Sequence, residues 1–330
     1  MTAHPGTDGL PAPRPVADGI ADLVGGTPLV RVRVGDGDAQ VLAKLESANP
    51  LSSIKDRAAL FMLDAAAERG ELRPGGTVIE ATSGNTGIAL AALAAARRHP
   101  CVIVLPDSAT AERIALLTAL GAEVVRTPRE QGYQGAIAKA EEIHAATPGS
   151  WFTCQHENED NVRAHYASTG PEIWADTGGR VDVLVCGVGT GGTLTGIARY
   201  LKERDPAVHV VAVEPESSPV LSRGAGGQHR IPGLNGGFVA ATTDVSLIDR
   251  VITVSDADAL RTARQLAREQ GVFVGISSGA AVHACALLLE KPGFQDATVV
   301  TVLPDTGERY LSVWDENPSP NDDRRSQPCP

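Results

Sequence analysis

The chain has 330 residues, enough to bury a large core, and 42% of them are hydrophobic, which is ordinary for a globular protein. Lys and Arg number 29 against 40 Asp and Glu, so the formal net charge is −11. This balance excludes a broad basic surface, and we expect neither nucleic acid nor a membrane as a partner.

Short β-branched runs alternate with amphipathic helical patterns along most of the chain. Residues 1–20 and 316–330 are rich in Pro and polar or small residues, which predicts disordered tails. The first series of expected strands covers Thr77–Thr82, Cys101–Pro106, Glu123–Thr127 and Trp151–Cys154, with helices at Ile88–Arg98, Ala111–Leu120 and Gly132–Ala146. The second series covers Val181–Cys186, His209–Glu214, Val251–Val254, Val272–Gly275 and Ala297–Leu303, again with helices between the strands. Apolar strands of this kind form sheets covered on both faces, so two α/β lobes with a cleft between them are predicted.

The first candidate site residue in chain order is Lys55, at the start of a helical pattern. Pro50 cannot continue a helix, and Ser53 with Asp56 three residues later predicts an N-cap and a capping box. Lys55 then falls in the first helical turn, where the positive end of the helix dipole disfavours a cation. Together with burial, this would lower the lysine pKa and free the amine to form a Schiff base. Taken alone, the pattern also fits an ordinary surface lysine.

Two of the later strand-to-helix junctions carry serine and glycine. In Ser83–Gly87, small polar residues at a helix start present free N–H groups that suit an anion such as a carboxylate. In Gly275–Ala281, a serine hydroxyl beside the strand end could meet a ring nitrogen. One of Ser277 and Ser278 is expected to be the N-cap of the following helix.

A third junction carries a literal G-x-G-x-x-G at Gly187–Gly192. Glu214 follows at the end of the next strand, where a dinucleotide-binding fold places its ribose-binding acid. Against this interpretation, Thr190 and Thr193 supply hydroxyls that suit a terminal phosphate monoester. From this loop alone, a dinucleotide and a phosphate monoester both stay open.

Cysteine and histidine usage is that of an intracellular protein without a metal site. The five cysteines show no C-x-x-C spacing, and three of them lie in apolar runs, as reduced core residues do. The first twenty residues lack a signal pattern and no stretch approaches the length of a membrane span, so we expect a cytoplasmic protein. The eight histidines show no metal spacing, and His165 is expected to be structural.

Five motifs occur in a fixed order, namely NPLSSIKDR, EATSGNTGIAL, GVGTGGTLTG, GISSGAA and LPDTGERYLS. In these the chain resembles the O-acetylserine sulfhydrylase (cysteine synthase) and cystathionine β-synthase family, fold-type II enzymes that depend on pyridoxal phosphate. The resemblance runs from about Asp22 to Val313 and implies a two-lobed, tryptophan synthase β-like α/β fold. The catalytic domain would cover residues 22–313, with a small lobe at about 48–160 and a large lobe at 22–47 plus 161–313. At the G-x-G-x-x-G loop, the resemblance favours the phosphate monoester.

The resemblance also implies a role for each matching residue. Lys55 would form the Schiff base with pyridoxal 5′-phosphate and later remove the substrate Cα proton. The other cofactor-binding residues would be Asn85 at the ring hydroxyl, Gly189, Thr190, Gly191, Gly192 and Thr193 at the phosphate, and Ser277 at the pyridine nitrogen. The substrate-binding residues would be Thr82, Ser83, Gly84, Thr86 and Gln155, around the carboxylate.

The implied reaction is β-replacement, in which a homodimer makes cysteine from O-acetyl-L-serine and sulfide through an α-aminoacrylate. Within the same chemistry, the alternative is a specialised synthase that uses another small nucleophile and makes cystathionine or a non-protein amino acid. A dinucleotide-dependent dehydrogenase built on Gly187–Gly192 and Glu214 is a hypothesis from a different class. So is a catalytically silent binding protein, against which the intact Lys55 argues.

The chain departs from the family pattern near the expected cleft. Residues 155–161 read QHENEDN where members often have QFSNPAN, and Ile231–Phe238 lacks the arginine that phosphoserine-using members tend to carry. If Glu157, Glu159 and Asp160 face the cleft, they would repel a phosphorylated substrate. We therefore expect the neutral acetyl ester to be preferred.

Overall fold

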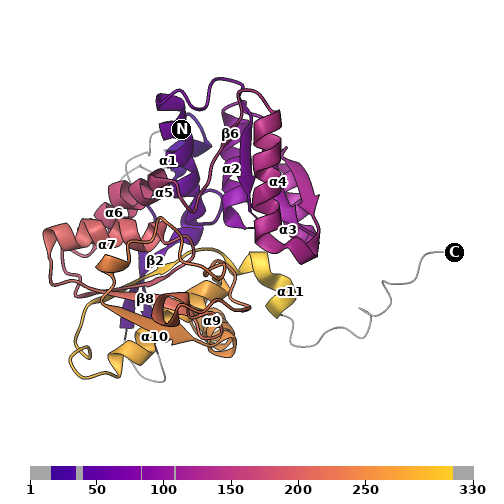
Figure 1. Ribbon diagram of the computed structural model, residues 1–330. Coiled ribbons are helices and arrows are strands. Elements are labelled where there is room, and N and C mark those ends of the chain that lie inside the picture. Colours follow the sequence, from indigo (N-terminus) through magenta and orange to yellow (C-terminus); the bar gives the residue numbers. More distant parts are fainter. Residues whose placement is uncertain (1–15, 35–39, 83, 108, 315–330) are drawn as a thin grey trace, which may run out of the picture.

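The computed structural model describes residues 16–34, 40–82, 84–107 and 109–314. Two sheets organise this part of the chain: a six-stranded sheet in the order β1-β2-β10-β7-β8-β9 and a four-stranded sheet in the order β5-β4-β3-β6. In Figure 1 the helices beside the smaller sheet (α2, α3, α4) lie above those of the larger sheet (α9, α10). The predicted two-lobed α/β architecture is confirmed, whereas the residue boundaries of the lobes stay predictions.

The larger sheet is parallel except at one edge, where β1 pairs antiparallel with β2. Its strands are β1 (Leu29–Arg33), β2 (Gln40–Leu45), β7 (Val183–Gly187), β8 (His209–Pro215), β9 (Arg250–Val254) and β10 (Val299–Leu303). The sequence patterns missed β1 and β2. The predicted strand at Val272–Gly275 is wrong, because only Val274 pairs there, in an isolated bridge with Thr306.

The smaller sheet is parallel throughout. Its strands are β3 (Val78–Ala81), β4 (Cys101–Pro106), β5 (Glu123–Thr127) and β6 (Trp151–Phe152). The bounds of β4 and β5 are those predicted, and β3 and β6 are shorter than predicted. Every residue of β3 and β4 is buried, which is the burial that a continuous apolar run indicates.

The helices cover both faces of both sheets. Around the smaller sheet they are α1 (Lys55–Glu68), α2 (Asn85–Ala96), α3 (Ala111–Ala119) and α4 (Gly132–Ala146). The others are α5 (Glu159–Ala164), α6 (Gly170–Asp176), α7 (Gly192–Arg204), α8 (Val220–Arg223), α9 (Asp256–Gln270), α10 (Ile276–Leu289) and α11 (Leu311–Trp314). Within the described ranges, no helix has the length and apolar character needed to cross a membrane.

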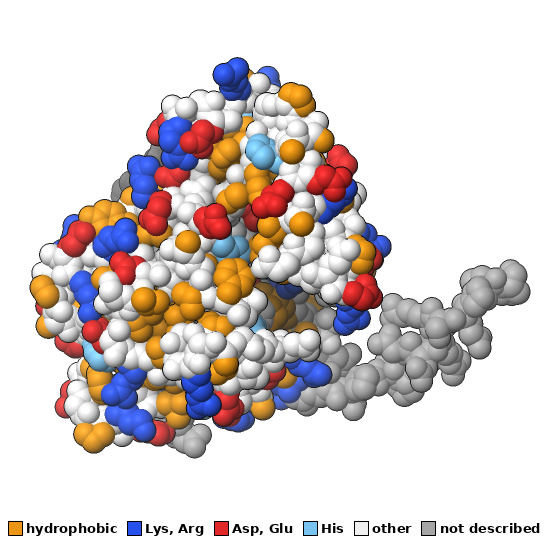
Figure 2. All heavy atoms as spheres, viewed as in Figure 1, with side chains coloured by type: hydrophobic (Ala, Val, Ile, Leu, Met, Phe, Trp, Pro, Cys, Tyr) orange, Lys and Arg blue, Asp and Glu red, His pale blue; other side chains and the backbone are white. Residues whose placement is uncertain are grey.

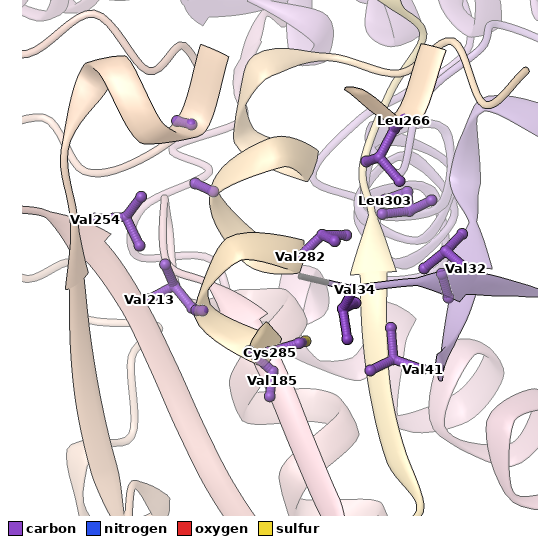
Figure 3. Close-up of a cluster of buried hydrophobic side chains, with 14 of the residues drawn as sticks. Val32, Val34, Val41, Val185, Val213, Val254, Leu266, Val282, Cys285 and Leu303 are labelled. Atoms are coloured by element: carbon purple, nitrogen blue, oxygen red, sulfur yellow. The ribbon is translucent and has the colours of Figure 1, made fainter. Parts of the chain in front are cut away.

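The largest buried cluster lies between the six-stranded sheet and the pair α9 and α10. Figure 3 shows Val185 and Leu303 on strands, facing Leu266 of α9 and Val282 with Cys285 of α10. A second cluster fills the opposite face of the sheet, beneath α7. Cys101, Cys186 and Cys285 are buried free thiols, as expected, and Cys329 lies outside the described residues. Helices thus cover both faces of the sheet. In such folds a ligand binds at the edge where the parallel strands end.

Candidate active site

A cleft of about 340 Å³ lies where the loops after β3, β6 and β7 come together. Predicted site residues in its lining are Lys55, Thr82, Gly84, Asn85, Thr86, Gln155, Gly189 and Thr190. The lining also includes His156, Pro232, Gly233, Leu234 and Gly236, from the two segments expected near the cleft, and Arg113, Tyr133 and Tyr310, which were not predicted. Figure 2 shows the surface hollowed between the upper and lower parts of the molecule. A larger hollow of about 460 Å³, beside α3 and α11, contains none of the predicted site residues.

Lys55 is the first residue of α1, so its predicted place in the first helical turn is confirmed. The predicted capping is wrong in detail, because the N-cap is Ile54 rather than Ser53. Ser53 Oγ accepts a hydrogen bond from the Lys55 N–H at 3.2 Å. The Asp56 carboxylate accepts a hydrogen bond from the Leu51 N–H at 2.7 Å, in place of the capping-box bond expected from the Ser53 N–H. These two bonds hold the start of α1 and fix the Lys55 backbone at the cleft.

The electrostatic setting of Lys55 is dominated by burial. Burial lowers the pKa of Lys55 to about 8, although Coulombic interactions with Glu80 and Cys186 act in the opposite direction. Burial also raises the pKa of the Glu80 carboxyl to about 8. Sequence patterns did not reveal Glu80, which lies in the middle of an apolar strand. The result is an amine that exchanges its proton close to neutral pH, as a base in catalysis must.

The predicted carboxylate-binding residues are brought together by a chain of hydrogen bonds. The Gly84 N–H donates to Thr82 Oγ1 at 3.1 Å, and Thr86 Oγ1 donates to Gln155 Oε1 at 2.6 Å. Gln155 Nε2 in turn donates to Glu80 Oε1 at 3.4 Å. The start of α2 is thereby tied to the loop after β6. Ser83, the remaining predicted member, lies outside the described residues.

Asn85 is held by the segment that follows β10. Its Nδ2 donates to Asp305 Oδ2 at 2.7 Å, and its Oδ1 accepts from Arg309 Nη1. Tyr310 OH also donates to Asp305, and burial raises the pKa of the Asp305 carboxyl. These partners belong to the LPDTGERYLS motif. The motif could have indicated a role near the cleft, but its contact with Asn85 could not be inferred from the sequence.

The glycine loop between β7 and α7 is shaped by positions where no side chain fits. A Cβ on Gly189 would lie 2.2 Å from the Gly233 carbonyl oxygen, and one on Gly192 would lie 2.4 Å from Asn161 Oδ1. Gly191 has a φ of 83°, in the left-handed region that favours glycine. Within the described chain, the N–H groups of residues 189–193 donate no hydrogen bond. Five consecutive donors at the start of a helix form a cradle for an anion.

Two threonine hydroxyls border this cradle. Thr190 Oγ1 accepts from Asn161 Nδ2 at 3.0 Å, and Thr193 Oγ1 lies 3.2 Å from His165 Nε2. His165 is fully buried, and burial lowers its pKa well below the usual value, so its ring is neutral. His165 was expected to be structural, and it also contacts Thr193, a predicted phosphate-binding residue.

The structure differs from two expectations, one about the serines of Gly275–Ala281 and one about Glu214 as a ribose-binding acid. Gly275 is the N-cap of α10, so neither Ser277 nor Ser278 has that role. Ser277 is buried beside Gly233, where a Cβ would lie 3.9 Å from Ser277 Oγ. The Glu214 carboxylate accepts from the N–H groups of Leu221 and Ser222 at 2.7 and 3.0 Å. Both of its oxygens are thus used within the protein, which argues against a ribose contact and against the dinucleotide hypothesis.

The acidic stretch after Gln155 does not face the cleft. Asp160 is buried and pairs with Arg69 at 2.7 Å and with Arg163 at 3.0 Å. Glu157 and Glu159 are exposed, and neither belongs to the cleft lining. The predicted repulsion of a phosphorylated substrate by these acids is therefore wrong. Of the departures from the family pattern in this stretch, only His156 reaches the cleft.

Known proteins are similar to this chain over most of its length. The family described as "Pyridoxal-phosphate dependent enzyme" matches residues 20–305. Cysteine synthase A of Escherichia coli (strain K12) is 47% identical over 300 residues, which cover 88% of this chain and 92% of that protein. The solved structure of a cysteine synthase from Entamoeba histolytica has a TM-score of 0.87 and 38% identity, covering 92% of each chain. That of O-ureido-L-serine synthase has a TM-score of 0.87 and 40% identity, covering 94% of this chain and 99% of the other.

Proposed function

This chain belongs to the pyridoxal-phosphate dependent enzyme family and is a cysteine synthase-like member of it, and we propose that it makes L-cysteine from O-acetyl-L-serine and sulfide. The observation that carries this proposal is the pairing of Lys55 with the glycine loop in one cleft. An amine whose pKa is about 8 and a cradle of five N–H donors are the two attachments that this cofactor needs.

The residues present fit pyridoxal 5′-phosphate. Lys55 would hold the aldehyde carbon, and the N–H groups of residues 189–193 would hold the phosphate. Asn85 Nδ2 donates one of its two hydrogens to Asp305, which leaves the other for the ring hydroxyl oxygen. Ser277 would meet the ring nitrogen. When bound, the cofactor supplies the electron sink that makes the substrate Cα proton removable.

The chain's own residues would then bind the amino acid and move one proton. The carboxylate would be held by the start of α2 and the loop after β6, through Thr82, Ser83, Gly84, Thr86 and Gln155. Lys55 Nζ would take the proton from Cα as the Cβ–O bond breaks and acetate leaves. Sulfide would form its bond to Cβ, and Lys55 Nζ would return the proton to Cα. Burial of Lys55 supports this role, because a desolvated amine both accepts and releases a proton near neutral pH.

The test is to incubate the holoenzyme with O-acetyl-L-serine and sulfide and to measure cysteine. Borohydride reduction followed by peptide mapping should place the cofactor on Lys55, and Lys55→Ala should abolish both the label and turnover. Lys139→Ala, at an exposed lysine paired with Glu142, is the matched control and should retain both. A label on another lysine, or cysteine formation by Lys55→Ala, would refute the assignment.

A second candidate is a synthase that joins the same amino acid to another small nucleophile. It is favoured by the similarity to O-ureido-L-serine synthase and by His156, which stands in the cleft where family members often have phenylalanine. Kinetics with a panel of nucleophiles, each at saturating O-acetyl-L-serine, separate the two candidates. A kcat/KM for sulfide below that for another nucleophile would favour the specialised synthase.

We further propose that the enzyme acts in the cytoplasm as a homodimer. Four free cysteines in the described chain, three of them buried, support a reducing compartment. The homodimer rests on the family resemblance alone. A monomeric mass in solution at micromolar concentration would contradict it.

A further inference from the structure

His156 contacts aromatic residues from two segments that border the cleft, the start of α4 and the loop at residues 231–238. It follows β6 of the smaller sheet, and its ring centroid lies 5.4 Å from that of Tyr133, near the start of α4. The imidazole ring centroid also lies 5.4 Å from that of Phe238. Phe238 ends the loop at residues 231–238, which resembles the segment that faces the substrate side chain. The imidazole therefore contacts two aromatic rings, and His156 lines the cleft.

The hydrogen bonds of Tyr133 determine which ring nitrogen of His156 carries the hydrogen. The Tyr133 hydroxyl lies 2.8 Å from the Ala81 carbonyl oxygen, which can only accept, so the single hydroxyl proton lies there. At the 3.2 Å contact between Tyr133 and His156 Nδ1, the hydroxyl oxygen must then accept. Nδ1 is consequently the protonated nitrogen, and Nε2 has a free lone pair. No hydrogen bond joins Nε2 to any residue that the structure describes.

The ring is also neutral. Burial, with a smaller contribution from the positive charge of Lys55, lowers the pKa of His156 to about 4. The two rings packed against it, Tyr133 and Phe238, carry no charge at neutral pH. Glu157, the next residue, is exposed and lies outside the cleft lining. His156 therefore supplies an uncharged hydrogen-bond acceptor in the lining of the cleft.

We propose that His156 selects the second substrate: Nε2 accepts a hydrogen bond from an N–H or O–H group next to the attacking atom of the nucleophile. This inference rests on the second candidate function, the synthase that joins the same amino acid to a nucleophile other than sulfide, and it names the class of that nucleophile. The favoured nucleophile is a small, uncharged donor of the N-hydroxyurea type. A bare anion gains nothing from Nε2, because it has no hydrogen to donate. His156 is thus a positioning residue for the nucleophile.

The kinetic test compares N-hydroxyurea with azide, a small nucleophile that carries no hydrogen at neutral pH. His156→Phe keeps an aromatic ring between Tyr133 and Phe238 but has no acceptor, and His156→Gln restores a polar atom near the position of Nε2. The ratio of kcat/KM for N-hydroxyurea to that for azide should fall about tenfold in His156→Phe. It should recover in part in His156→Gln. An unchanged ratio in His156→Phe, including an equal loss for both nucleophiles, would overturn the proposal.

A measurement without turnover tests the same point. In the holoenzyme labelled with ¹⁵N-histidine, the His156 resonances should report hydrogen on Nδ1 and none on Nε2, and N-hydroxyurea should shift the Nε2 signal where azide does not. Hydrogen on Nε2, or equal shifts with both ligands, would overturn the proposal. A wild-type enzyme that consumes neither nucleophile nor sulfide with O-acetyl-L-serine would instead contradict the proposed function itself, and the tautomer would remain readable.

Discussion

Replacing Thr190 by valine should weaken the hold on the phosphate of the cofactor without disturbing the fold. Thr190 Oγ1 accepts from Asn161 Nδ2 at 3.0 Å, so its own proton remains available for a phosphate oxygen. Valine keeps the branched shape, and Asn161 Nδ2 keeps its second bond, to the Gln155 carbonyl oxygen at 2.9 Å. A hydrogen bond to a charged group contributes about 1.5–3 kcal/mol, so the affinity should fall roughly 10- to 150-fold.

The assay is a titration of the apoprotein, followed by absorbance, with pyridoxal phosphate and separately with pyridoxal. Pyridoxal has the same ring and aldehyde but no phosphate, so Thr190→Val should bind it as the wild type does. Thr190→Ser, which keeps the hydroxyl, is the matched control variant. Equal losses for both ligands, or no loss for pyridoxal phosphate, would refute the reasoning and place the phosphate elsewhere.

Two further predictions concern Lys55 and the buried ion pairs beside it. The apoprotein should react with pyridoxal phosphate faster as the pH rises through about 8, because only the unprotonated amine of Lys55 attacks. Glu80→Gln should move the midpoint of this pH dependence to lower pH, because the Glu80 charge raises the pKa of Lys55. Stopped-flow absorbance measures the rate, and a rate that does not depend on pH would contradict the prediction. Arg57→Ala should lower the free energy of unfolding by about 3–5 kcal/mol, since it leaves the buried Glu46 carboxylate without the guanidinium whose Nε now lies 2.8 Å from it. Urea unfolding measures this loss of stability. The control variant Lys139→Ala, at a surface ion pair, should lower the free energy of unfolding by about 0.5 kcal/mol or less. Equal losses in Arg57→Ala and Lys139→Ala would contradict the prediction.

The sequence predicted those elements whose pattern is decided by local burial. The bounds of β4, β5 and α4 were predicted residue for residue. The unbroken apolar run of β4 and the helical period of α4 are each visible within one window. β1 was missed because Leu29–Arg33 alternates apolar and basic residues at the edge of a sheet, where one face stays polar. Val272–Gly275 is apolar enough for a strand, but only Val274 finds a partner.

The same division holds in the cleft. The sequence by itself determined where Lys55 sits in its helix and where the glycine loop turns, because each depends on neighbours within a few residues. Tertiary structure alone decided that Glu80 lies beside Lys55, that Asp160 turns to Arg69 instead of the cleft, and that Tyr133 fixes the tautomer of His156. Charge interactions and hydrogen bonds depend on distances between atoms, and folding sets those distances between residues that the sequence places far apart.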